Sequence, residues 1–124
     1  MGIIKSLHNI LPEQVLAQKT IMEILSPAGN MYALIAALRT GADAVYFGAG
    51  NFNARRNADN FSFEELKEAI KLCKKYGAKS YLTLNTIIKE DELIDAFNTA
   101  KNAYLYGVDA VIVQDVGLIN LLHE

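Results

Sequence analysis

Short apolar runs alternate with longer amphipathic stretches along most of the chain. The apolar runs are rich in β-branched and aromatic residues and show little polar alternation, which is typical of strands buried in a parallel sheet. The predicted strands are 22–25, 44–48, 80–85 and 110–115. The predicted helices, in which apolar residues recur every three or four positions, are 31–40, 62–76 and 91–106, with another beginning after residue 115. This alternation predicts an α/β fold built on parallel βα repeats.

A glycine follows each of the three complete predicted helices and opens the segment that leads into the next strand. The repeated segments are GADAVYFG from Gly41, GAKSYLTLN from Gly77 and GVDAVIVQD from Gly107. Glycine is favoured just after a helix because it adopts left-handed backbone angles without steric cost. At the helix starts, Asn30 is a candidate N-cap, and Ser62 with Glu65 matches a capping box.

The spacing of apolar residues also predicts the buried side of each helix. In 62–76 the expected stripe is Leu66, Ala69, Ile70 and Cys73. In 91–106 it is Leu93, Phe97, Ala100 and Tyr104. Cys73 is the single cysteine, so the chain can form neither an intrachain disulfide nor a multi-cysteine metal site. We interpret Cys73 as a small buried apolar residue.

The number of repeats leaves two architectures open. Residues 21–124 hold four βα units, and residues 1–20 form an N-terminal extension in which we expect a helix around Pro12. Four units fit either a small doubly wound sheet or the first half of a (β/α)₈ barrel, which usually needs about 250 residues. A half-barrel leaves two apolar strand edges unpaired, which favours aggregation. A homodimer contributing 4 + 4 strands, or a missing C-terminal half-barrel, would cover these edges.

Composition excludes several classes of protein. With 52% apolar and 21% charged residues, the chain is globular and not disordered. A net charge of −2 argues against general binding of nucleic acid through a basic face. No apolar run reaches the roughly 18 residues of a membrane span, and the N-terminus lacks the apolar centre of a signal peptide. We therefore expect a cytoplasmic protein with no membrane partner, and we expect no metal site.

Polar residues follow the predicted strands at the edge where parallel α/β folds bind ligands. The candidate substrate-binding residues are Asn30, Asn53, Arg55, Asn85 and Gln114, and Asp115 stands beside them. Structural roles compete with binding: Asn30 and Asp115 also suit helix N-caps, and Asn85 also suits a local turn. The Gln114 amide ends an apolar run and needs polar partners, which the mouth of a site would supply.

The predicted loop NFNARRNADNFS, residues 51–62, carries amide, guanidinium and aromatic side chains that a simple connector does not need. Arg55 offers a planar fork for a carboxylate or phosphate, and Asn53 can hydrogen-bond substrate or hold the loop. Phe61 and Ser62 are better assigned to the start of the following helix, and Arg56 to solvent. The alternative is a well-packed connector. As a binding element, the loop favours an anionic group.

Taken together, these motifs resemble the N-terminal portion of the collagenase-like peptidases, peptidase family U32. The motifs are MEILSPAGN, GADAVYFG, an arginine-containing loop ending in NFS, TLNT and DAVIVQD, and they run from Met22 to Leu122. The resemblance implies a (β/α)₈ TIM-like barrel. It implies a peptidase acting on collagen-like substrates or, alternatively, hydroxylation of transfer or ribosomal RNA or of ubiquinone precursors. The substrate would then be a peptide or an RNA.

The cysteine motif of the family lies in the second half of its barrel, and several members hold an iron–sulfur cluster on four cysteines. The single cysteine here gives those ligands no counterpart, so we expect no cofactor in this chain and a cluster only in a longer homologue. As part of such an enzyme, the chain would carry part of the substrate-binding mouth, with Asp115 as acid/base and Arg55 as anion clamp. The other hypothesis is a non-catalytic, self-associating module.

Overall fold

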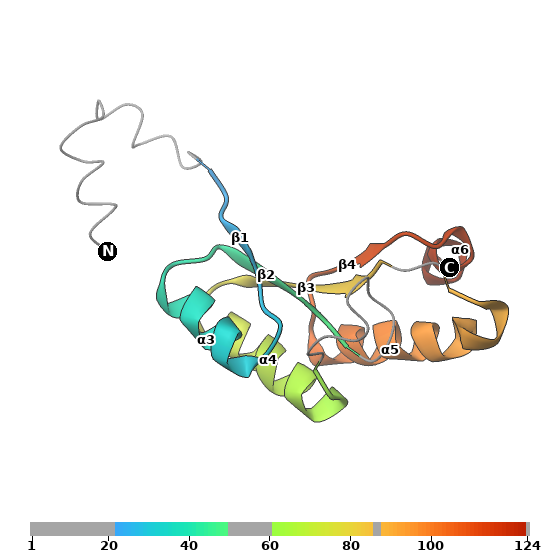
Figure 1. The fold of residues 1–124 in the computed structure, drawn as a ribbon, viewed down its shortest axis with the longest axis horizontal. Helices are drawn as coiled ribbons and strands as arrows, with labels where there is room; N and C mark the ends of the chain where they lie inside the picture. Colours follow the sequence, from blue (N-terminus) through green and yellow to red (C-terminus); the bar gives the residue numbers. More distant parts are fainter. Residues whose placement is uncertain (1–21, 50–60, 86–87, 124) are drawn as a thin grey trace.

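The structure is a computed structural model that describes residues 22–49, 61–85 and 88–123. Within these residues the chain alternates strands and helices (Figure 1). In chain order they are β1 Leu25–Pro27, α3 Met31–Arg39, β2 Ala44–Gly48, α4 Phe63–Lys75, β3 Lys79–Leu84, the short 3₁₀ helix η1 Glu90–Glu92, α5 Leu93–Tyr106, β4 Ala110–Val113 and α6 Val116–His123. The predicted parallel α/β repeats are confirmed.

The sheet has the order β1-β2-β3-β4, and every neighbouring pair is parallel. Strands that are consecutive in sequence are thus also consecutive in space. Helices α3, α4 and α5 lie side by side against one face of this sheet (Figure 1). A doubly wound fold reverses its strand order and covers both faces with helices, so that alternative is wrong for the described residues. A singly wound, consecutive sheet is the arrangement of a (β/α)₈ barrel.

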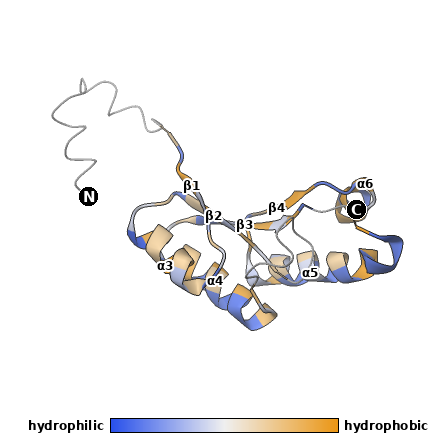
Figure 2. Cartoon of the chain, in the orientation of Figure 1, coloured by the Kyte–Doolittle hydropathy of each residue, from blue (hydrophilic) through white to orange (hydrophobic). Residues whose placement is uncertain are grey.

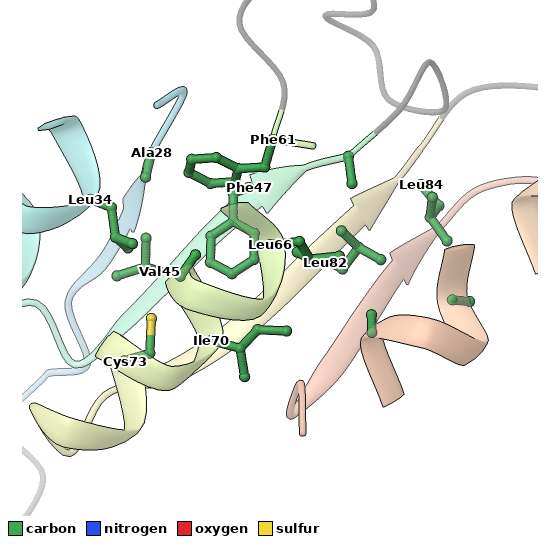
Figure 3. Packing of buried hydrophobic residues seen from close by; sticks show 14 of the residues in the cluster. Ala28, Leu34, Val45, Phe47, Phe61, Leu66, Ile70, Cys73, Leu82 and Leu84 are labelled. Atoms are coloured by element: carbon green, nitrogen blue, oxygen red, sulfur yellow. The ribbon is translucent and has the colours of Figure 1, made fainter. Parts of the chain in front are cut away.

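The core lies between the sheet and the helices (Figure 3). Val45 and Leu82 of the strands are fully buried near Leu66 and Ile70 of α4, and Leu84 is buried further along β3. The predicted stripe of α4 is confirmed, since all four of its residues are buried. The core thus forms where alternate strand residues meet one helical stripe.

Helix α5 confirms its predicted buried stripe only in part, because Ala100 is buried and Leu93 and Phe97 pack against the core, whereas Tyr104 does not. Its buried residues are Ala96, Thr99, Ala100 and Ala103, whereas the predicted Tyr104 is 75% exposed. Leu93 and Phe97 are only half-buried. Small side chains on this face let α5 approach its neighbours closely, and a periodicity argument that weights large apolar residues misses such a face. Phe97 and Tyr104 instead line a groove between α5, β4 and α6.

The first strand was also misplaced, since 22–25 was predicted and Leu25–Pro27 is observed. Its pairing with β2 sets the position, because Leu25 pairs with Ala44 and Pro27 with Tyr46. Proline is compatible with this strand because β1 lies at the edge of the described sheet. The other strands and the helices agree with the predicted ranges within about two residues.

The glycine caps behave as predicted. Gly41, Gly77 and Gly107 have φ angles of 99°, 72° and 98°, in the left-handed region that favours glycine. Each follows the last turn of a helix and redirects the chain towards the next strand. In the described part of the chain, no helix is both long and apolar enough to cross a membrane.

Candidate functional site

The carboxyl ends of the strands form one edge of the sheet, which we call the rim. Asn30 follows β1, Asn85 follows β3, and Gln114 and Asp115 follow β4. Because the strands are parallel, the structure brings these four predicted residues to the same edge. Asn53 and Arg55 lie outside the described residues, so their assignment to the site stays a prediction.

Asn30 serves as the N-cap of α3. Its side-chain oxygen accepts a hydrogen bond from the Ala33 N–H at 2.8 Å, and its backbone is extended, with φ −154°. The capping alternative for Asn30 is therefore confirmed. The cap uses the amide oxygen, which leaves the NH₂ as the group that Asn30 would offer a ligand. Asn30 consequently suits a hydrogen-bond donor at the rim better than an acceptor.

Asp115 is held by the backbone of two segments. Its Oδ1 accepts a hydrogen bond from Leu118 N–H at 3.0 Å, which caps α6, and its Oδ2 accepts one from Ile88 N–H at 3.0 Å. The carboxylate therefore ties the segment after β3 to the start of α6. The capping alternative is confirmed for this residue as well.

The same bonds affect the chemistry of Asp115. The hydrogen bonds from Leu118 and Ile88, with a smaller one from Gly117, lower the pKa of the carboxyl against a minor opposing effect of desolvation. A carboxylate with a lowered pKa is a weak proton acceptor near neutral pH. An acid/base role for Asp115 stays a prediction, and it would require a ligand that displaces one of these bonds.

The lowered pKa predicts a specific pH dependence of stability. A carboxyl whose pKa is depressed by folding stabilises the protein above its unfolded pKa, about 3.9, and loses this contribution as pH falls through the folded pKa. We expect Asp115→Asn to flatten the decline in melting temperature below about pH 4. Thermal melts between pH 7 and 3 test this. An equally steep acid decline in wild type and variant would contradict it.

The other two rim residues differ in burial. Asn85 is half-buried at the end of β3, whereas Gln114 is exposed. Solvent can satisfy an exposed amide, so the argument that Gln114 needs buried partners does not hold. Its place at the rim still makes it accessible to a ligand. For both residues, a substrate-binding role stays a prediction.

The residues that flank 50–60, Ala49 and Phe61, are held together at the rim. Phe61 N–H donates to the Gly48 carbonyl at 3.0 Å, and Phe61 forms an isolated parallel bridge with Ala49. The Phe61 ring is 2% exposed and meets the Phe47 ring edge to face, with centroids 5.2 Å apart (Figure 3). Sequence reasoning assigned Phe61 to the helix start but missed this pair, because nothing local signals a contact with the preceding strand.

The turn into α4 matches the prediction. Ser62 and Glu65 form a reciprocal capping box, with Glu65 N–H donating to Ser62 Oγ at 3.3 Å and Ser62 N–H donating to Glu65 Oε1 at 3.1 Å. The Ser62 hydroxyl thus accepts a bond from the backbone. The described residues on either side of Arg55 in the sequence, Ala49 and Phe61, therefore lie at the rim between β2 and α4.

Reactive groups are few in the described residues. Their His, Cys, Asp and Glu side chains form no group of three or more that could hold a metal ion. Cys73 lies on the buried side of α4, and burial, aided by the charge of Asp109, raises its pKa to about 11. A thiol of this kind stays protonated near neutral pH and is a poor nucleophile. A single cysteine does not fit a four-cysteine iron–sulfur cluster.

Comparison with known proteins places this arrangement in a family. The chain is 45% identical over 100 residues to the 23S rRNA 5-hydroxycytidine C2501 synthase of Escherichia coli K12, covering 81% of this chain and 15% of that protein. It is 37% identical over 103 residues to a collagenase of Porphyromonas gingivalis W83, covering 82% and 25%. It is 38% identical over 98 residues to tRNA hydroxylation protein P1 of Bacillus subtilis 168, covering 74% and 23%.

Among solved structures, the U32 peptidase Mk0906 has the same fold, with a TM-score of 0.61 at 15% identity, covering 82% of this chain and 44% of that one. The chain spans a quarter or less of the length of the three curated relatives above. The model of peptidase family U32 matches residues 29–124. As that match includes all the βα repeats from α3 onwards, the chain belongs to peptidase family U32.

Proposed function

We propose that this chain is the N-terminal half-barrel of a collagenase-like peptidase and carries part of its substrate-binding mouth. The observation that carries the proposal is the rim, where parallel strands bring Asn30, Asn85, Gln114 and Asp115 to one edge. Barrels of this class bind substrates at that edge. The P. gingivalis relative named a collagenase supports a peptide as the substrate.

The contribution of these residues is binding and orientation. Asn30 would donate to a backbone carbonyl of a peptide, and Arg55 would pair with a carboxylate. The described residues offer no activated nucleophile, since Cys73 is buried and protonated and Ser62 caps α4. The groups that cleave the peptide would therefore come from outside the described residues. We also propose a cytoplasmic location.

A second candidate function is support of RNA hydroxylation. It is favoured by the identities of 45% and 38% to relatives named for modification of ribosomal and transfer RNA. Arg55 suits a phosphate as well as a carboxylate, because the guanidinium fork matches both. The net charge of −2 weighs against RNA, since the chain lacks the excess of cations that backbone binding requires.

Fluorescence anisotropy distinguishes the two candidates. The purified chain is titrated into a labelled peptide of Gly-Pro-Ala repeats and, separately, into a labelled single-stranded RNA at the same salt concentration. Saturable binding of the peptide, with no more than weak and strongly salt-dependent binding of the RNA, is the expected result. Tight binding of the RNA alone would favour the second function. Failure to bind either probe would contradict the proposal that this chain carries part of a substrate-binding site.

A paired substitution tests the role of the loop. We expect Arg55→Ala to weaken binding of the preferred probe by about tenfold or more, which corresponds to loss of a charge-assisted hydrogen bond. Arg56→Ala, the adjacent control, should change binding by no more than about twofold, because we assign Arg56 to solvent. Both melting temperatures should match wild type. Equal losses from the two variants would show a nonspecific effect of charge and contradict the assignment.

A further inference from the structure

The alternation of side chains along β4 divides the rim residues between the two faces of the sheet. Val111 and Val113 pack against the core, so the residue between them, Ile112, lies on the opposite face. Continuing this alternation past the end of the strand puts Gln114 on the face of Ile112 and Asp115 on the helix side. Asp115 agrees with this placement, because its carboxylate caps α6. Gln114 therefore lies on the face opposite the core.

Asn85 occupies the matching position at the end of β3. Thr83 pairs with Ile112 in the parallel register. Asn85 and Gln114 each lie two positions further on, so they come side by side on the same face, and we call them the amide pair. Neighbouring strands are about 4.8 Å apart, which puts both side chains within reach of one ligand. The colouring changes from hydrophobic to hydrophilic where β4 ends (Figure 2).

A hydrogen bond joins the two segments that carry the amide pair. Ile88 comes three positions after Asn85, and its N–H donates to Oδ2 of Asp115 at 3.0 Å. Asp115 in turn follows Gln114 directly. The other carboxylate oxygen of Asp115 accepts from Leu118 N–H, so the start of α6 is tied to the same point. The spacing of the two amides is thus set before a ligand arrives, which lowers the entropic cost of binding.

Neighbouring residues on the same face direct a ligand to the strand ends. Thr83, two positions before Asn85, is 6% exposed, so the body of β3 is closed to a ligand. Gly48 of β2 pairs with Thr83 and adds no side chain to this face, which allows a main chain to approach closely. A ligand at the rim therefore meets the Asn85 amide before any deeper residue of β3.

We propose that the amide pair binds the main chain of an extended peptide, with one amide donating to a peptide carbonyl and the other accepting from a peptide N–H. Each carboxamide is uncharged and carries two donors and an acceptor, so the pair matches the neutral peptide group. The inference rests on the proposed peptide-binding function and names the groups that bind the peptide main chain. Amides also bind the edge of adenine, but the net charge of −2 disfavours the phosphates of an RNA.

Side-chain NMR of the wild-type chain tests the amide pair directly. The NH₂ groups of Asn85 and Gln114 give their own signals in a proton–nitrogen correlation spectrum. Titration with an unlabelled peptide of Gly-Pro-Ala repeats should shift both signals with one dissociation constant. The NH₂ signal of Asn98, which is exposed on α5 and thus on the helix side of the sheet, should not shift.

The other outcomes of this titration separate the inference from the function on which it rests. Peptide binding that leaves either amide signal unshifted would overturn the amide pair and leave the proposed function standing. A peptide that does not bind at all would overturn both. Shifts of the two signals with single-stranded RNA alone would overturn the peptide as the ligand.

Matched substitutions measure how much the pair contributes. Asn85→Asp and Gln114→Glu keep the shape of each side chain but replace the NH₂ donor with a carboxylate oxygen, so each should weaken peptide binding about fivefold or more. Asn98→Asp adds the same charge on α5 and should change binding by less than about twofold. Gln114 is exposed, so Gln114→Glu should stay folded, as circular dichroism would show, even if Asn85→Asp does not. Unchanged binding by Gln114→Glu, or an equal loss with Asn98→Asp, would overturn the amide pair.

Discussion

Replacing Phe47 with alanine lowers the free energy of unfolding by about 3–5 kcal/mol, which is the usual cost of removing a buried aromatic ring. The Phe47 side chain is 2% exposed at the centre of the core, and its ring meets Phe61 at an interplanar angle of 75°. The substitution therefore removes the buried apolar surface of the ring together with its contact to Phe61, and it leaves a cavity beneath the rim. Urea unfolding followed by circular dichroism measures the loss.

Two further variants keep this prediction falsifiable if Phe47→Ala does not fold. Phe47→Leu retains most of the apolar volume and should cost clearly less, about 1–1.5 kcal/mol. Phe63→Ala is the exposed control, because Phe63 begins α4 with 46% of its side chain exposed, and it should change stability by less than about 1 kcal/mol. Losses of equal size at Phe47 and Phe63 would show that the Phe47–Phe61 contact does not support the sheet.

Local signals predicted much of the fold because local physics determines them. The caps at Asn30 and Ser62 depend on residues three positions away, and the left-handed turn at Gly41 depends on one missing side chain. The buried side of α5 was not predictable in the same way. That side is chosen by how closely a helix can approach its neighbours, which favours Ala96 and Ala103 over the larger Tyr104.

The sequence also could not tell which sheet face would be covered. Tyr46 and Phe47 lie next to each other in an apolar strand, so the pattern suggests burial on both sides. Helices cover only the Phe47 side of the described sheet, and the inner face of a barrel has the same apolar composition as a helix-covered face. Composition alone cannot separate these two environments, whereas the consecutive strand order does.

The candidate site was predictable in position and less so in role. The rule that ligands bind at the carboxyl ends of parallel strands placed Asn85 and Asp115 on one edge. Whether a carboxylate there caps a helix or serves as a base depends on distant partners. Asp115 accepts a hydrogen bond from the Ile88 N–H, 27 positions earlier in the chain, and no local sequence pattern predicts that bond.

Two aspartates in equivalent positions of the repeat should contribute unequally to the stability of the fold. Asp43 and Asp109 each precede a strand, and each carboxylate accepts a hydrogen bond from a backbone N–H of the preceding strand segment, at 2.7 Å from Ile24 and 2.8 Å from Ser80. Ser80 is fully buried, whereas Ile24 is 56% exposed. Burial of the donor therefore decides how much each bond contributes.

Asp109→Ala should lower the free energy of unfolding by about 1–3 kcal/mol, because it leaves the partly buried N–H of Ser80 without its acceptor. Asp43→Ala should cost less than about 1 kcal/mol, since water can replace the carboxylate at an exposed N–H. Urea unfolding of both variants at pH 7 gives the comparison, and Asp109→Asn should restore part of the loss by returning an acceptor oxygen. Equal costs at the two positions would mean that the repeated aspartate acts through its charge near the strand start, and that burial of the donor has no part in its contribution.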